Sequence, residues 1–251
     1  MQGQFKYDAK GSEFFSVMFV QMLLTMITFG IYLPWAVVKI RKFFCDHLTL
    51  DGKKFDFNGE GGELFSYAFV HILLTMVTCY IYLPWAMVKI EKYFYEKTTY
   101  DGKPFEFTGE GGKLFSVLFV NYFLSMITCG IYYAWAMVNI MKYYVENSKL
   151  DNIAFEFKAD GKEYFSLFFV QMLLTMVTCG IYAPWAIVKI EKYLYSKTGY
   201  NGRSFNFSGE GGALLSLILK GVALSGITCG IYYFWFINDL IRFFADNSSI
   251  N

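Results

Sequence analysis

A fifty-residue repeat runs through the whole chain and sets the strongest limit on its fold. The stretch from Thr178 to Tyr193 has a counterpart at the same offset in every block, without insertion or deletion. Units this short rarely bury a hydrophobic face alone, and they share a core with their neighbours. The sequence therefore predicts one domain, residues 1–251. Its five repeats are 1–50, 51–100, 101–150, 151–200 and 201–251.

The distribution of apolar residues favours a membrane protein. Hydrophobic residues make up 55% of the chain and charged residues 17%, which exceeds the apolar share of an ordinary soluble domain. No charged residue occurs from Phe14 to Val38, from Leu64 to Val88 or from Tyr164 to Val188, and each run is long enough to cross a bilayer. The alternative is a soluble repeat protein with an unusually apolar core.

Each unit predicts a strand, a helix, a tight tip, a second helix and a returning strand. In Phe55-Asp56-Phe57 the alternation puts both aromatics on one face, and Asp51-Gly52 before it is a hairpin signal. The first helix is expected near 63–78, and Pro84 starts the second. We therefore expect an α-helical membrane protein with small β-hairpins, its five repeats closed into a pseudo-fivefold ring.

The two ends of the chain carry complementary halves of one hairpin. Residues 4–8 correspond to a second strand without a first, and residues 248–251 correspond to a first strand without a second. Pairing them satisfies the backbone groups of both. We expect this pairing to close the ring and to bring Lys6 near Ser249. Residues 1–13 are polar and predict a strand rather than a signal peptide.

Charge and aromatic residues predict an orientation. The basic residues follow each tip on the second helix, so the positive-inside rule puts the hairpins and both termini in the cytoplasm. The tryptophans are expected to anchor each hairpin at a membrane interface. They are Trp35, Trp85, Trp135, Trp185 and Trp235. A first helix of about 16 residues is short of a ~30 Å hydrocarbon layer, so the tip stops inside the bilayer or the membrane thins around it.

The first helix of four units carries a polar stripe on one face. Its residues are Gln21, Thr25 and Thr28, His71, Thr75 and Thr78, Asn121, Ser125 and Thr128, and Gln171, Thr175 and Thr178. Two interpretations are open, hydrogen bonding between helices and the lining of a pore.

The second helix carries a charged stripe. Its basic residues are Lys39, Lys42, Lys89, Lys92, Lys189 and Lys192, and the third and fifth units interrupt it with Asn139 and with Asn238-Asp239. These side chains either extend to the cytoplasmic interface or face a wet axial cavity.

Two further patterns are given structural interpretations. Cys79, Cys129, Cys179 and Cys229 recur at one position, a spacing typical of neither disulfides nor zinc sites, so we expect small buried apolar side chains. The glycine cluster at 59–62 and its counterparts predict a plain strand-to-helix turn rather than an anion-holding loop, because no Lys-Ser/Thr follows.

The repeated motif resembles a known family. F-x-F-x-G-x-G-x-x-L-F, then T-C-G-I-Y-x-P-W-A and an Asp-Gly hairpin, are similar to the repeat of the bacterial YjgN-like family of uncharacterised inner-membrane proteins. The likeness is clearest at 109–132 and 178–193. It implies an integral protein of the bacterial inner membrane and supplies no activity or catalytic residue.

Function is narrowed to two hypotheses. The first is a conduit for ions or small solutes, because five helices about 10 Å apart leave an axis of roughly 3 to 4 Å free radius. The second is a structural ring that organises lipid or anchors a partner. Net charge is +1 with interleaved signs, which argues against nucleic acid, and His47 and His71 stand in no catalytic arrangement. We predict no enzyme and no cofactor, membrane lipid as the partner, and no identifiable protein partner.

Overall fold

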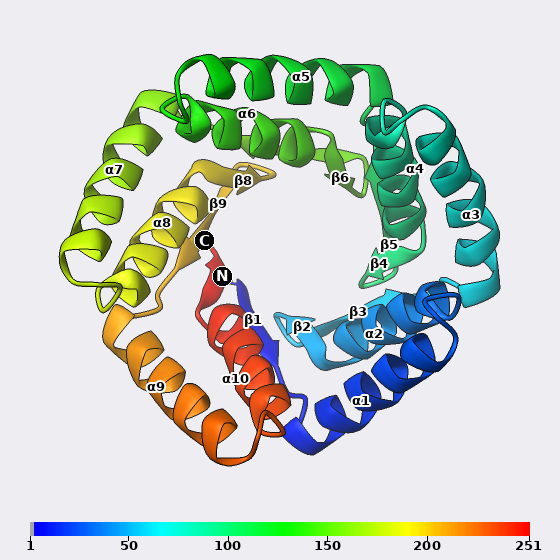
Figure 1. Ribbon diagram of the computed structural model, residues 1–251, viewed down its shortest axis with the longest axis horizontal. Coiled ribbons are helices and arrows are strands. Elements are labelled where there is room, and N and C mark those ends of the chain that lie inside the picture. The colour runs from blue at the N-terminus through cyan, green and yellow to red at the C-terminus, as the bar shows by residue number, and fades with distance from the viewer. Residues whose placement is uncertain (1–2) are drawn as a thin grey trace.

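Five pairs of helices stand on a closed barrel of short strands in the computed structural model, which describes residues 3–251 (Figure 1). Each unit contributes a long strand, two helices and a short strand. The strands are β1 (Gly3–Tyr7), β2 (Leu48–Leu50), β3 (Lys53–Phe57), β4 (Thr98–Tyr100), β5 (Lys103–Phe107), β6 (Ser148–Leu150), β7 (Ile153–Phe157), β8 (Thr198–Tyr200), β9 (Arg203–Phe207) and β10 (Ser248–Ile250). The helices are α1 (Gly11–Ile27), α2 (Leu33–His47), α3 (Gly61–Val77), α4 (Leu83–Glu96), α5 (Gly111–Ile127), α6 (Tyr133–Glu146), α7 (Gly161–Val177), α8 (Ala183–Lys197), α9 (Gly211–Ile227) and α10 (Tyr233–Asp246).

The barrel is closed because every strand pairs on both sides. The order is β1-β10-β9-β8-β7-β6-β5-β4-β3-β2, antiparallel throughout. Asp51 and Gly52 take φ values of 54° and 72° between β2 and β3, the turn that the sequence predicts. Asn152 takes the glycine position in the fourth unit with φ of 62°. The hairpin turns are therefore confirmed, including the divergent one.

The predicted pairing of the chain ends is confirmed, with a different register. β1 pairs with β10 through Gly3 opposite Ile250 and Gln4 opposite Ser249. Lys6 instead lies opposite Thr49 of β2, so the expected proximity of Lys6 and Ser249 is wrong. The first two residues of β1 pair with β10 and its last three pair with β2. A comparison of repeats does not reveal this division.

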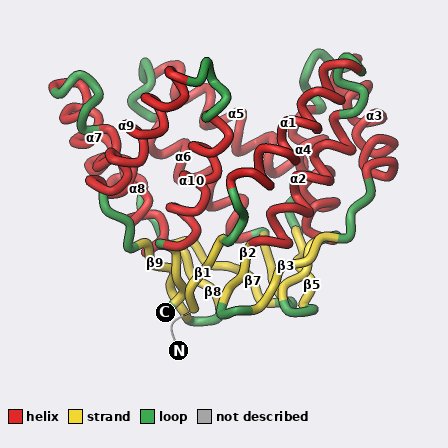
Figure 2. The backbone as a smooth tube through the Cα atoms, turned by 90° about the horizontal axis from the view of Figure 1, so that it is seen from below, coloured by secondary structure: helices red, strands yellow, loops and turns green. Residues whose placement is uncertain are grey.

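The helices form two layers around the axis (Figure 1). α2, α4, α6, α8 and α10 make the inner layer, and α1, α3, α5, α7 and α9 make the outer layer. Each inner helix packs on the outer helix of its own unit and on that of the next unit, and α10 packs on α1 to complete the circle. The hairpin tips lie at the end away from the barrel (Figure 2).

The predicted fold class, an α-helical membrane protein with small separate β-hairpins, is wrong. The ten strands described form a single closed barrel, because β3 pairs with β2 on one edge and with β4 of the next hairpin on the other. Unpaired edges would leave backbone groups unsatisfied, and joining the hairpins removes every edge.

Within residues 3–251, no helix has both the length and the apolarity needed to cross a membrane.

In four of the five long strands, β3, β5, β7 and β9, a phenylalanine is buried where two units meet. Phe57 is 1% exposed and packs with Val38 of the preceding unit and Leu64 of its own. The same cluster recurs around Phe107, Phe157 and Phe207. Burying an aromatic or aliphatic side chain of this size stabilises a fold by about 1.5–3 kcal/mol. The units therefore share one continuous core, as the repeat length predicts.

Candidate functional site

The five hairpin tips share one pattern of hydrogen bonds between a threonine side chain and the backbone. Thr28 Oγ1 accepts a hydrogen bond from the Tyr32 N–H at 3.1 Å and donates to the Leu24 carbonyl at 2.7 Å. Both bonds recur in the other four units. Gly30, with φ of 88°, donates its N–H to the Thr25 carbonyl at 2.8 Å, which is how a glycine ends a helix. The threonine explains why units with Ala134 or Phe234 in place of proline keep the same tip.

The tips present an exposed apolar surface, which we call the apolar crown. It consists of the exposed large apolar side chains at the tips of α1 to α10. They are Ile27, Phe29, Ile31, Leu33, Val77, Tyr80, Ile81, Leu83, Ile127, Ile131, Tyr133, Val177, Ile181, Ile227, Ile231 and Tyr233. Phe29 is 97% exposed, and Val77 and Val177 are more than 80% exposed. No charged residue lies in any of these tips.

Four of the five cysteines lie in the same tips and are exposed. The prediction of burial is therefore wrong for Cys79, Cys129, Cys179 and Cys229, and only Cys45 is buried. The tip cysteines have φ between 47° and 50°. This left-handed turn follows directly after the helix and points their side chains away from the bundle. This position does not require a small side chain, because Phe29 adopts the same conformation in the first unit with φ of 50°.

The polar stripe lies inside the hairpins, between outer and inner helices. Gln21 is 5% exposed, and its Oε1 accepts a hydrogen bond from the Tyr32 hydroxyl at 3.2 Å. Gln171 and Tyr182 repeat this contact at 3.2 Å, and Asn139 donates to Asn121 at 2.9 Å. These contacts are those expected from hydrogen bonding between helices. A pore-lining role for the stripe remains a prediction.

The other stripe residues bond mainly to their own helices. His71 Nδ1 lies 3.2 Å from the Tyr82 hydroxyl. The hydroxyls of Thr25, Thr75 and Thr175 donate to carbonyls four residues earlier, as do those of Thr28, Thr78, Thr128 and Thr178. Ser125 is the exception, because its buried hydroxyl has no partner.

The lysines of the charged stripe lie beside the polar stripe, in grooves between the two helices of a hairpin. The Lys189 ammonium donates to the Tyr182 hydroxyl at 2.8 Å, and Lys39 lies over the Tyr32 ring at 5.9 Å. Burial, and then the charge of Lys89, lower the pKa of the His71 ring. Lys39, Lys42, Lys89, Lys189 and Lys192 are exposed, and Lys92 is half-buried. The structure thus brings the two predicted stripes together on the flank of each hairpin.

These grooves have room for a headgroup-sized molecule. The groove between α5 and α6 has a volume of about 820 Å³ and is lined by Ser116, Asn121, Asn139 and Lys142 among others. Its counterpart between α9 and α10 measures about 460 Å³. The serine of the first helix, Ser116 or Ser216, lines the same groove.

The tryptophans join neighbouring units. A Cβ on Gly61 would lie 2.3 Å from Trp35 Cδ1, and the same close approach joins Trp85 to Gly111 and Trp235 to Gly11. Trp135 and Trp185 pack in the same way on the next unit. The glycine cluster is thus a turn, as predicted, whose second glycine, Gly61 in the second unit, makes room for tryptophan. Membrane anchoring by Trp35, Trp85, Trp135, Trp185 and Trp235 remains a prediction.

Sequence reasoning missed a set of residues at the axis. Phe5, Phe55, Phe105, Phe155 and Phe205 project into the barrel and line axial cavities of about 680 and 400 Å³. Arg41 lines the larger cavity, and Glu91, Met141, Glu191 and Ile241 occupy the corresponding positions. Burial raises the pKa of both carboxyls, and Arg41 opposes this rise at Glu91. The predicted pseudo-fivefold symmetry does not extend to these side chains. Their variation between units was the sequence signal that could have identified the site.

The described residues offer little for metal chemistry. From residue 3 to residue 251, no three His, Cys, Asp or Glu side chains gather in a group that could hold a metal ion.

Comparison with known proteins identifies a family. The model described as "Bacterial protein of unknown function (DUF898)" matches residues 2–66, 53–116, 103–163 and 152–216. "Inner membrane protein YjgN" of Salmonella typhimurium is 45% identical over 49 residues, 20% of this chain and 12% of that protein. Its namesake in Escherichia coli K12 is 37% identical over 51 residues, 20% of this chain and 13% of that protein. The chain thus covers only a small part of these relatives' length. No solved structure matches the chain.

Proposed function

The chain belongs to the DUF898 family of bacterial proteins, and we propose that it is a ring seated in the inner membrane through its apolar crown. The observation that supports membrane seating is the apolar crown itself, in which Phe29, Val77 and Val177 are among the most exposed side chains. A large contiguous apolar surface marks contact with a membrane or another protein. The name of the matched relatives, inner membrane protein, favours the membrane.

The charged stripe limits the depth of insertion in this proposal. Lys39 and Lys42 follow Pro34 by five and eight residues, so they lie about 8 and 12 Å along the helix from the tip. Lysines at this depth extend their ammonium groups to the headgroups while their stems remain in lipid. The crown therefore enters one leaflet to about 10 Å, as interfacial helices do. The barrel and both termini lie in the cytoplasm by the positive-inside rule.

We propose that the seated ring organises lipid and does not conduct solutes. Phenylalanines line the barrel axis, with neighbouring ring centroids 6.2 to 6.5 Å apart. The stripes that suggested a conduit are engaged on the hairpin flanks. The grooves between α5 and α6 and between α9 and α10 offer lysine and amide groups to anionic headgroups, so membrane lipid is the proposed partner.

Vesicle binding by the full chain tests the seating. Replacing Ile31, Ile81, Ile131, Ile181 and Ile231 together by aspartate puts a charge in every tip, and we expect the variant to leave the membrane fraction under carbonate extraction. A matched control replaces five exposed barrel residues by aspartate, including Lys54 and Lys103, and should remain bound. If the folded tip variant still floats with vesicles, the crown does not seat the ring.

Ion flux tests the lipid-organising half of the proposal. Proteoliposomes loaded with an ion-sensitive dye should leak no faster than empty vesicles of the same composition. Flux that scales with protein and is blocked by bulky substitution at Phe105 would instead support the conduit.

A further inference from the structure

The larger axial cavity contains one unsatisfied polar group. Its remaining polar lining side chains are hydrogen bonded, with Tyr95 to Ser148 at 2.7 Å and Thr98 and Thr198 to helix carbonyls. Ser148 donates to the Tyr144 carbonyl at 2.7 Å, so the Tyr95 hydroxyl must donate to Ser148. Neither hydroxyl has a hydrogen left for a ligand. Arg41 alone among the lining residues carries a charge.

Arg41 is held in the cavity without a carboxylate partner. Its guanidinium carbon lies 4.8 Å from the Phe94 ring centroid and 5.8 Å from that of Phe57. Its Nε is buried and has no hydrogen-bond partner, and no salt bridge of residues 3–251 includes it. Arg41 as a whole is half-buried, and a partly desolvated guanidinium is stabilised by an anionic hydrogen-bond partner. The cavity therefore lacks one anionic hydrogen-bond acceptor.

The rest of the lining selects an apolar molecule. Phe44, Phe55, Phe105, Phe155 and Phe205 surround a space of about 680 Å³, within the range of ligand-binding cavities. One cation cannot neutralise a polyanion, and it repels an organic cation. A neutral lipid leaves the guanidinium unpaired. Only a molecule with one anionic end and an otherwise apolar body satisfies both parts of the lining.

We propose that this cavity binds a long-chain carboxylate, a fatty acid anion, with its head on Arg41 and its chain among the barrel phenylalanines. Arginine pairs with carboxylates through two parallel N–H donors, which gives both strength and orientation. Glu91 on α4 lies within electrostatic reach of Arg41 and tunes this site by competing with the ligand's charge. The site lies at the barrel end, so it does not depend on the seating of the crown.

Binding of a fluorescent polyene fatty acid to the full chain, delipidated in a neutral detergent, tests the proposal. Arg41→Met imitates the third unit, where Met141 occupies this position, and it should weaken binding roughly 10- to 100-fold. Glu91→Gln should strengthen it several-fold. Lys54→Met removes an exposed cation of β3 that does not line the cavity and should change nothing.

Head-group competition keeps the test independent of how the variants fold. On the wild-type protein, the saturated acid should displace the probe at least ten times better than the alcohol of equal length. Equal displacement by acid and alcohol would overturn the proposal, as would an unchanged affinity in folded Arg41→Met or no binding at all. A single-chain phosphate monoester that displaces the probe tenfold better than the acid would overturn the carboxylate assignment.

Discussion

The ring has five junctions between units, and the seam between the last and first units differs from the four that the chain links. At the linked junctions an apolar pair is buried, such as Phe57 with Val38 or Phe107 with Val88. At the seam the corresponding residues are Tyr7 and Asn238. The Tyr7 hydroxyl donates to Asn238 Oδ1 at 3.1 Å, and Asn238 is fully buried.

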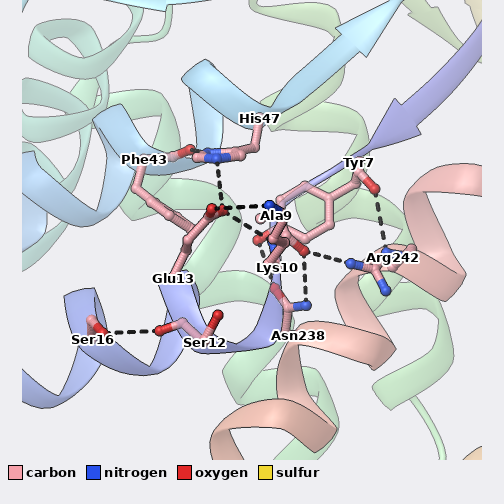
Figure 3. A network of polar contacts seen from close by, with 10 residues as sticks. All are labelled: Tyr7, Ala9, Lys10, Ser12, Glu13, Ser16, Phe43, His47, Asn238 and Arg242. Carbon is pink, nitrogen blue, oxygen red and sulfur yellow. Dashed lines mark hydrogen bonds and ion pairs between the residues drawn. The ribbon is translucent and has the colours of Figure 1, made fainter.

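The seam pair belongs to a larger polar network (Figure 3). Asn238 Nδ2 donates to the Ala9 carbonyl at 3.1 Å, and Arg242 donates to the carbonyls of Tyr7 and Ala9. The Tyr7 N–H donates to Asp246 Oδ1 at 2.8 Å. The seam thus keeps the shape of the other junctions and replaces their apolar contact with directional bonds.

This difference shows how a closed ring is made from an open chain. A linked junction forms at high local concentration because its two sides are covalently joined. The seam has no such help, and a set of apolar junctions alone would pair equally well with the end of a second chain. One buried polar pair can fix register and partner choice, as it does in coiled coils. Tyr7 and Asn238 therefore fix the register in which the two chain ends pair, because neither finds its polar partner at a linked junction.

The largest expected effect is the loss of unfolding free energy when alanine replaces the glycine that packs against a tryptophan at a junction. The comparison is between Gly111 at a linked junction and Gly11 at the seam. A Cβ on Gly111 would lie 2.4 Å from Trp85 Cδ1 and 2.8 Å from its Cα. Gly111→Ala must shift backbone, and we expect a loss of about 3 kcal/mol in unfolding free energy. At Gly11 the nearest atoms all belong to the Trp235 side chain, which can move, and the linked junction at Gly161 has the same kind of contact with Trp135. Gly11→Ala should cost less in denaturant titration, and equal losses would contradict the distinction.

The second effect tests the polar pair itself. Asn238→Val leaves the buried Tyr7 hydroxyl without an acceptor and should cost about 1–3 kcal/mol. Adding Tyr7→Phe recreates the apolar pair of the other junctions and should restore most of this stability. We expect the double variant to form domain-swapped oligomers, measured by light scattering after refolding. A double variant that is fully monomeric would show that the pair does not direct closure.

The smallest expected effect on unfolding free energy comes from a substitution at a hairpin tip, remote from every junction. Tyr80 has φ of 68° where the other tips have glycine, and nothing approaches the corresponding position of Gly30 within 4 Å. Tyr80→Gly should raise the unfolding free energy by about 0.5–1 kcal/mol, because relief of left-handed strain exceeds the entropy cost of glycine. Gly180→Tyr should do the reverse. Neither should alter oligomeric state, and a change there would contradict the separation of tip and seam.

Features encoded by a short stretch of the chain, or by an unpaired strand at its ends, could be predicted from the sequence. Asp51-Gly52 specifies its turn locally, and the half-hairpins at the chain ends imply their own pairing. The barrel could not be predicted, because Phe57 pairs with Thr98 across more than forty residues and no local pattern specifies that neighbour. The contact of Trp35 with Gly61 likewise joins different units.

The candidate sites show a second reason for failure. Comparison of repeats emphasises what units share, which revealed the polar and charged stripes. The position of Arg41 holds a cation, two carboxylates and two apolar residues in the five units, so the comparison hid the axial site. Asn238 was visible only as an interruption of the charged stripe. Its partner Tyr7 lies more than 200 residues away, and only the closed ring brings the two together.

A disulfide across the seam tests ring closure most directly. Gln4 and Ser249 lie opposite each other in β1 and β10, so Gln4→Cys with Ser249→Cys, in a background without the five native cysteines, should oxidise to an intramolecular bond. Its product should run as a compact monomer on a non-reducing gel. The off-register pair Lys6→Cys with Ser249→Cys serves as the control and should oxidise more slowly. Exclusively intermolecular bonds from the Gln4 and Ser249 pair would contradict closure of the chain on itself.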